Sequence, residues 1–403
     1  MTARVIHAGV GCILLAQVSL TLAAAELFPK PAENFACAPQ RCSNLVPARS
    51  PDAPETNDCA YRNGNEWWLD YVAGSLAWNS GNEQRKPVTV AVFDDGVDVQ
   101  HVDIKEQLWI NAAEAHGKPG IDDDHNGYID DLNGWDFVGS DPIVSPEAEC
   151  VQRRSHGTFM SSLIAAKRNN NSGIAAAGSD GARVMALRIV GCGLGNQDRV
   201  NPERIQRALD YAVSMGARIL SFSNHWYVSS PALDAAFAEI ADKPGSPRAA
   251  IVVASVPARG EAKVGYPAAY PYRRIVRAVP LGNDDAISPG VSEAPVGLNF
   301  GSPSACVIGA TSAPDHYAIT NGSSNSTAIL SGLLAGLWSA SAYATLTPDD
   351  FVARVVRGKM SGTLRRSKAG SRPPYQTGVP IADACILQTT LRSANVCRPS
   401  ETP

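Results

Sequence analysis

Three residues whose side chains can carry out nucleophilic chemistry lie far apart in this chain, each in a distinctive local sequence. Asp94 lies in VAVFDDGVD, His156 in SHGTFMSSLIAA and Ser324 in NGSSNSTAILSG. An acid, an imidazole and a hydroxyl are the groups with which a serine is activated to attack a carbonyl carbon. Acid, then base, then hydroxyl is one of the few chain orders found for such a triad. We therefore predict that the three residues form one catalytic site.

The segments around the three residues predict how they are placed. Residues 88–93 are β-branched and apolar, which predicts a buried parallel strand with Asp94 at its carboxyl end. His156 precedes apolar and small residues at helical spacing, so it is expected at a helix N-terminus. Ser324 precedes the apolar stretch 328–342, which predicts a buried helix with backbone N–H groups beside the hydroxyl. Proteins with open α/β sheets have their binding sites at the carboxyl ends of the strands.

The remaining elements also alternate between strand and helix. Residues 201–216 predict a helix with an Asn cap, a proline in the first turn and a terminal glycine. Residues 218–222 and 250–254 predict two further buried strands. Alternation of this kind predicts an α/β fold of three layers, a mostly parallel central sheet with helices on both faces.

The motifs resemble those of the subtilisin-like serine proteases, which form the subtilase family (peptidase S8). The similarity extends from about residue 67 to about residue 390. It implies a subtilisin-like fold, Ser324 rather than Ser323 as the nucleophile, and Asp94 rather than Asp95 as the acid. Asp95 is expected to be the more exposed acid and to face the substrate. The matching segments are Asp94-Asp95-Gly96, His156-Gly157-Thr158-Phe159 and Gly322-Ser323-Ser324-Asn325-Ser326, with further similarity at 173–175, 184–188, 211–217 and 266–271.

The chain departs from the family pattern around the expected substrate cleft. After a strand like 251–254 the family has Ala-Gly-Asn, whose Asn amide donates to the oxyanion, whereas this chain has Ala258 at the Asn position. The resemblance therefore implies that this donor is absent and that the backbone N–H of Ser324 remains. His225 replaces a glycine at the cleft edge, which would narrow the cleft. The residues expected to line the cleft are Ser223, Asn224, His225, Ser255 and Arg259, of which Asn224, His225 and Arg259 are candidate substitute donors.

These departures leave more than one function open. The first is a serine endopeptidase that acts on polypeptides through an acyl-enzyme on Ser324, with His156 as general base and Asp94 orienting it. The second is a catalytically impaired protein of the same fold that binds peptides or a partner. A third is a calcium-stabilised structural domain of an envelope.

An acidic segment between Asp94 and His156 predicts a calcium site. Alternate oxygen-bearing side chains followed by glycine resemble the start of an EF-hand loop, although the terminal Glu of that loop is missing. Calcium is favoured because every candidate ligand is a hard oxygen. A solvated acidic turn is the alternative. The candidate ligands are Asp122, Asp124, Asn126, Asp130 and Asp131, with the carbonyl of Tyr128.

Composition is that of an exported protein with a sizeable core. The 403 residues are 44% hydrophobic, and the formal net charge of −4 comes without the basic stripe that nucleic acid requires. Residues 1–25 predict a signal peptide, with an uncleaved membrane anchor as the alternative. Its removal would take Cys12 and leave eight cysteines, an even number that suggests disulfides in a secreted or periplasmic protein without a stable membrane span.

The expected domain organisation follows from composition and from the extent of the family resemblance. Residues 26–63 are rich in proline and cysteine and predict an irregular N-terminal arm. Residues 64–392 are predicted to form the subtilisin-like catalytic domain, and residues 393–403 a C-terminal tail. The oligomeric state is not predicted.

Overall fold

The structure is a computed structural model that describes residues 56–78, 85–152, 155–192, 201–228, 230–258, 260, 264–282, 284–312, 316–357, 368 and 380–382. The chain separates into two units, residues 1–33 and 34–403, and all described residues belong to the second. The predicted signal peptide (1–25) and tail (393–403) lie outside the described residues. Within the described part of the chain, no helix has the length and apolar character needed to cross a membrane.

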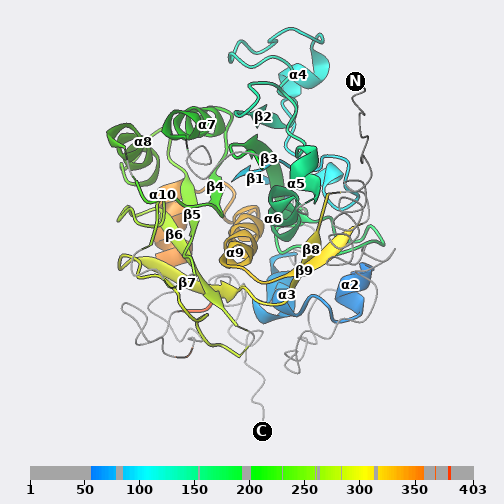
Figure 1. The fold of residues 1–403 in the computed structure, drawn as a ribbon, viewed down its shortest axis with the longest axis vertical. Helices are drawn as coiled ribbons and strands as arrows, with labels where there is room; N and C mark the ends of the chain where they lie inside the picture. Colours follow the sequence, from blue (N-terminus) through cyan, green and yellow to red (C-terminus); the bar gives the residue numbers. More distant parts are fainter. Residues whose placement is uncertain are drawn as a thin grey trace, which may run out of the picture. The chain divides into compact units, whose positions relative to one another are not determined.

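A parallel sheet of seven strands lies at the centre of the described unit (Figure 1). Its strand order is β2-β3-β1-β4-β5-β6-β7, and every neighbouring pair is parallel. The strands are β1 (Val88–Asp94), β2 (Gly134–Asp136), β3 (Ala182–Arg188), β4 (Ile219–Phe222), β5 (Ile251–Ser255), β6 (Ile275–Leu281) and β7 (Leu298–Pro303). A separate antiparallel pair consists of β8 (Val307–Ala310) and β9 (Tyr317–Thr320).

Helices surround this sheet. The longer ones are α6 (His156–Ala165), α7 (Pro202–Ser214), α8 (Pro231–Ala241) and α9 (Ser323–Trp338). The short α-helices are α2 (Cys59–Arg62), α3 (Trp67–Tyr71), α4 (Ala112–His116), α5 (Ala148–Gln152) and α10 (Pro348–Phe351). Two 3₁₀ turns, η2 (Gly74–Trp78) and η3 (Lys105–Gln107), and the π-helical turn η4 (Val352–Arg357) complete the described elements.

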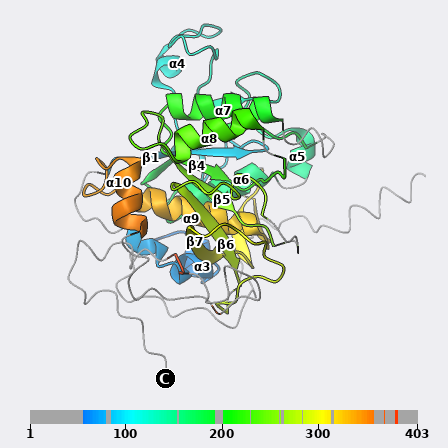
Figure 2. The ribbon, with the colours of Figure 1, turned by 90° about the vertical axis from the view of Figure 1, so that its left-hand side faces the viewer.

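The central strands are buried on both faces, as continuous apolar strands in a covered parallel sheet must be. In β1, Val90 and Val92 belong to one core, which contains the apolar residues of α6 and α9. Ala91 and Phe93 belong to the other core, which contains those of α7 and α8. Figure 2 shows α7 and α8 along one face of the sheet and α9 along the other. The predicted three-layer α/β fold of subtilisin type is therefore confirmed.

Two helices whose first turns carry predicted catalytic residues pack closely against each other. A Cβ at Gly332 of α9 would lie 2.5 Å from the carbonyl oxygen of Ile164 in α6, so only glycine allows this approach. A Cβ at Gly178 would likewise lie 2.3 Å from the same oxygen. Because α6 begins at His156 and α9 at Ser323, this crossing determines how far apart the two helix N-termini lie.

The last residues of the predicted N-terminal arm are packed against the rest of the unit. Tyr61 of α2 is buried, and the backbone N–H of Ala60 donates to the Gly173 carbonyl at 3.0 Å. The Asp58 carboxylate accepts from the backbone N–H of Asn169 at 2.9 Å. Residues 56–63 therefore pack against the unit that follows the predicted domain boundary at residue 64.

We predict that Gly332→Ala lowers the melting temperature because the added methyl group forces α6 and α9 apart. Overpacking of this kind costs about 1–3 kcal/mol. Thermal unfolding followed by circular dichroism measures the change, with Gln206→Ala in α7 as the control. Alanine is otherwise the better helix former by about 1 kcal/mol, so an increased melting temperature would contradict the close contact.

Candidate active site

The end of β1 and the first turn of α6 bring Asp94 and His156 together. The His156 Nδ1 atom lies 2.9 Å and 2.8 Å from the two carboxylate oxygens of Asp94. Asp94 is 3% exposed, whereas the His156 side chain is 40% exposed. Gly157 allows the approach, since a Cβ there would lie 2.2 Å from the Gly96 carbonyl oxygen. The contact orients the imidazole with Nδ1 on the acid and leaves Nε2 for chemistry.

The charges around His156 favour its protonated form. Burial on its own lowers the pKa of His156, but the charge and hydrogen bond of Asp94, together with the charge of Asp95, raise it to about 9. An imidazole accepts a proton only in its neutral form. The population able to act as a base therefore increases as the pH rises toward and beyond this value.

Ser324 lies in the first turn of α9, next to the end of β4. Its hydroxyl donates to the Ser223 carbonyl oxygen at 3.5 Å, and the Ser223 hydroxyl donates to the Ser324 carbonyl oxygen at 3.4 Å. The buried Asn325 holds the turn before the helix, because its Nδ2 donates to the carbonyl oxygens of Ser304 at 3.1 Å and Thr320 at 3.3 Å. Sequence reasoning missed this role of Asn325, although a polar residue within an apolar helix was a signal for it.

His156 and Ser324 face one cavity, whose volume is about 640 Å³. Ala258 lies on the same cavity, so the structure brings the expected oxyanion position together with the base and the hydroxyl. A concave site of this size is typical of a ligand pocket. The lining residues are His156, Phe159, Met160, Ala258, Pro280, Ser288, Pro289, Ser304, Ala305, Thr320, Asn321, Gly322, Ser323, Ser324 and Asn325.

The other residues predicted to line the cleft are placed differently. Asn224 donates its amide nitrogen to the Phe93 carbonyl oxygen at 2.7 Å, which ties it to the end of β1. Ser255 is 2% exposed, and its hydroxyl has no hydrogen-bond partner among the described residues. The His225 ring packs edge-on against Tyr227 at 5.3 Å, and Arg259 lies outside the described residues.

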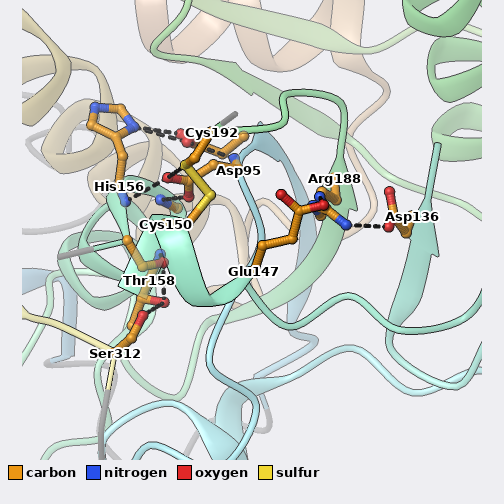
Figure 3. Close-up of a disulfide and its surroundings, with 12 residues drawn as sticks. Asp95, Asp136, Glu147, Cys150, His156, Thr158, Arg188, Cys192 and Ser312 are labelled. Atoms are coloured by element: carbon orange, nitrogen blue, oxygen red, sulfur yellow. Dashed lines mark hydrogen bonds and ion pairs between the residues drawn. A yellow bond between two sulfur atoms is a disulfide. The ribbon is translucent and has the colours of Figure 1, made fainter. Parts of the chain in front are cut away.

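Asp95 is the more exposed of the two acids, as predicted, but it exceeds Asp94 only slightly and is itself buried. It is 7% exposed, and its carboxylate accepts hydrogen bonds from the backbone N–H groups of His156 at 3.0 Å and Gly157 at 2.7 Å. Figure 3 shows this carboxylate beside the disulfide between Cys150 and Cys192. Burial and the neighbouring Asp94 raise the pKa of Asp95 to about 6.

The acidic segment brings together only part of the predicted calcium ligands. Carboxylate oxygens of Asp124, Asp131 and Glu114 all lie within 4.8 Å of one another. Sequence analysis missed Glu114, which lies on α4, ahead of the acidic segment (Figure 1). Burial raises the pKa of Asp131. Three carboxylates this close repel each other when all are charged, and carboxylate oxygens are the ligands that hard cations prefer.

The remaining predicted ligands form hydrogen bonds within the acidic loop. Asp122 accepts from the backbone N–H groups of Asn126 at 3.0 Å and Gly127 at 2.8 Å. Asp130 accepts from the Gly120 N–H. Asn126 accepts from the Tyr128 N–H through Oδ1, so its amide nitrogen, not its oxygen, points toward the carboxylate group, with 3.1 Å to Asp124.

Comparisons with known proteins agree with this geometry. A model of the subtilase family matches residues 85–378. Subtilisin-like protease 1 of Plasmodium vivax is 30% identical over 183 residues, which cover 45% of this chain and 27% of that protein. Thermitase of Thermoactinomyces vulgaris is 24% identical over 210 residues, which cover 52% of this chain and 61% of thermitase. The chain thus spans about a quarter of the Plasmodium relative it matches and less than two thirds of thermitase.

Proposed function

This chain belongs to the subtilase family, and we propose that it is an exported serine endopeptidase that cleaves polypeptides through an acyl-enzyme on Ser324. The observation that carries the proposal is the Asp94–His156 pair, whose histidine lines one cavity with Ser324. Family membership supports a serine protease, and the cavity beside the hydroxyl gives a substrate room to bind.

The proposed mechanism assigns one role to each group. His156 takes the proton of the Ser324 hydroxyl through Nε2 as the oxygen attacks the peptide carbonyl carbon, and it returns that proton to the leaving amine. Asp94 holds the imidazole tautomer and stabilises the imidazolium that forms. Before attack, the hydroxyl must turn from the Ser223 carbonyl toward Nε2. Water then cleaves the acyl-enzyme by the same steps.

Export is supported by the signal-like sequence of residues 1–25 and by the disulfide between Cys150 and Cys192, which an oxidising compartment would preserve. Cys59 and Cys306 are disulfide-bonded as well. These features favour a secreted or periplasmic location.

A second candidate function is a peptide-binding protein of the same fold with impaired turnover. Ala258 favours it, because a methyl group on the cavity wall cannot donate a hydrogen bond to the oxyanion. The backbone N–H of Ser324 has no partner within its own helix and remains as one donor.

We predict that a fluorophosphonate probe labels the wild-type protein and that Ser324→Ala abolishes the labelling, because the probe reacts only with an activated serine hydroxyl. Mass spectrometry of the labelled peptide identifies the site. Ser323→Ala is the matched control and should retain the label. An unlabelled wild-type protein that still binds peptides would support the second candidate function instead.

We also predict that Ala258→Asn increases kcat with little change in KM, because the new amide would stabilise charge that develops only in the transition state. In subtilisin, a member of this family, loss of such a donor lowers kcat by about 10²–10³-fold, and that measured value sets the scale. Ala258→Leu is the control, because leucine is similar in size to asparagine but has no hydrogen-bond donor. Equal kcat values for the two variants would show that position 258 does not face the oxyanion.

We further propose that Glu114, Asp124 and Asp131 hold a structural Ca²⁺ ion. Excess EGTA should then lower the melting temperature, because an ion at 100 times its Kd stabilises the folded state by about 2.7 kcal/mol. Asp131→Asn should remove the response to EGTA, whereas the exposed Glu106→Gln should retain it. A wild-type melting temperature that EGTA does not change would refute the site.

A further inference from the structure

We propose that Asp95 is a positioning residue for the catalytic base, with a carboxylate that holds the backbone of His156 while Asp94 holds its imidazole. The proposal rests on the proposed function, because it assigns a role within the same site. Two consecutive acids at the end of β1 would then fix both parts of one histidine.

Asp95 accepts hydrogen bonds from the backbone of the first turn of α6. A helix leaves its first backbone N–H groups without partners inside the helix. Asp95 accepts from the first two, at His156 and Gly157, through separate carboxylate oxygens at 3.0 Å and 2.7 Å. Ser155 accepts from the third, with its hydroxyl at 3.4 Å from the Thr158 nitrogen. The regular bonds of the helix begin at Phe159, whose N–H donates to the Ser155 carbonyl at 3.3 Å. Two of the three bonds that precede them therefore depend on Asp95.

Asp95 is itself held in place by its neighbours. Its backbone N–H donates to an Asp94 carboxylate oxygen at 2.8 Å, so the two acids have a fixed relative orientation. The Cys192 sulfur lies 3.7 Å from one Asp95 oxygen, and its disulfide partner Cys150 is buried (Figure 3). The disulfide thus covers one side of the Asp95 carboxylate and limits its contact with water. A carboxylate that is shielded from water interacts more strongly with a helix N-terminus and with nearby charges.

The position of Asp95 also couples it electrically to the base. The charged groups that face it are Asp94 from β1 and His156 from α6, and the disulfide contributes no titrating group. Arg188 of β3 is paired with Asp136 and Glu147 instead (Figure 3). The charge of Asp95 adds to the rise in the pKa of His156. Loss of this charge should therefore make the imidazole easier to deprotonate, an effect that a purely structural role would not produce.

Asp95→Asn tests both parts of the proposal. It removes the charge, and it leaves one side-chain oxygen to accept from the two N–H groups of His156 and Gly157. We expect the ascending limb of kcat/KM against pH to lie at lower pH than in the wild type, because the charge of Asp95 raises the pKa of His156. We expect kcat to fall by roughly 10²-fold, the size of effect that a misplaced catalytic group produces, with little change in KM. Asp98→Asn, on the same turn with a carboxylate that accepts from the Gln100 N–H, is the matched control and should retain the wild-type limb.

A limb that stays at its wild-type midpoint, with a kcat equal to that of Asp98→Asn, would overturn the proposal. If Asp95→Asn does not fold, hydrogen exchange of the wild-type protein provides the test. Protection of the His156 and Gly157 amides, corrected for intrinsic exchange, should fall as the pH drops through about 6, where Asp95 takes up a proton. Protection that does not change there would also overturn it. Absence of fluorophosphonate labelling would refute the proposed function instead and leave the exchange result interpretable.

Discussion

The contact between the end of β1 and the first turn of α6 is the interaction on which the site depends. It requires a glycine at position 157, because a side chain there would meet the Gly96 carbonyl. Once the two backbones meet, consecutive acids can bond to the imidazole and to the backbone of His156. The close packing of Gly332 against Ile164 then sets where α9, and with it Ser324, begins. Two glycine contacts thus help to place His156 and Ser324 at one cavity, with Asp94 buried behind the imidazole.

Most of the fold could be predicted because its signals are local. The apolar run that forms β1, the helix start at His156 and the apolar stretch of α9 each carry their own periodicity, and a parallel sheet follows from their alternation. The positions of Asp94, His156 and Ser324 could be predicted for the same reason, since each lies where such an element starts or ends.

The parts that sequence reasoning missed depend on tertiary contacts. Nothing local distinguishes an Asp95 that faces solvent from one that accepts two N–H groups from a helix 61 residues later. Glu114 joins Asp124 and Asp131 only because α4 lies beside the acidic loop. Asn224 bonds to the Phe93 carbonyl across two adjacent strands, β1 and β4. In each case the side chain could have satisfied its hydrogen bonds in several ways, and long-range packing selected one.

The same electrostatics that position His156 also favour its protonated form. The charges of Asp94 and Asp95 raise the pKa of His156 and so lower the fraction of neutral imidazole at neutral pH. The imidazole is 40% exposed in the free protein. A peptide bound over it would remove water, and burial lowers the pKa of an imidazole, so substrate binding itself would increase the fraction of neutral base. Substrate binding cannot change Ala258 in this way, because a methyl group is not a hydrogen-bond donor whether or not water is present. The protonation of His156 therefore depends on the ligand, whereas the lack of a side-chain donor at Ala258 is fixed by the sequence.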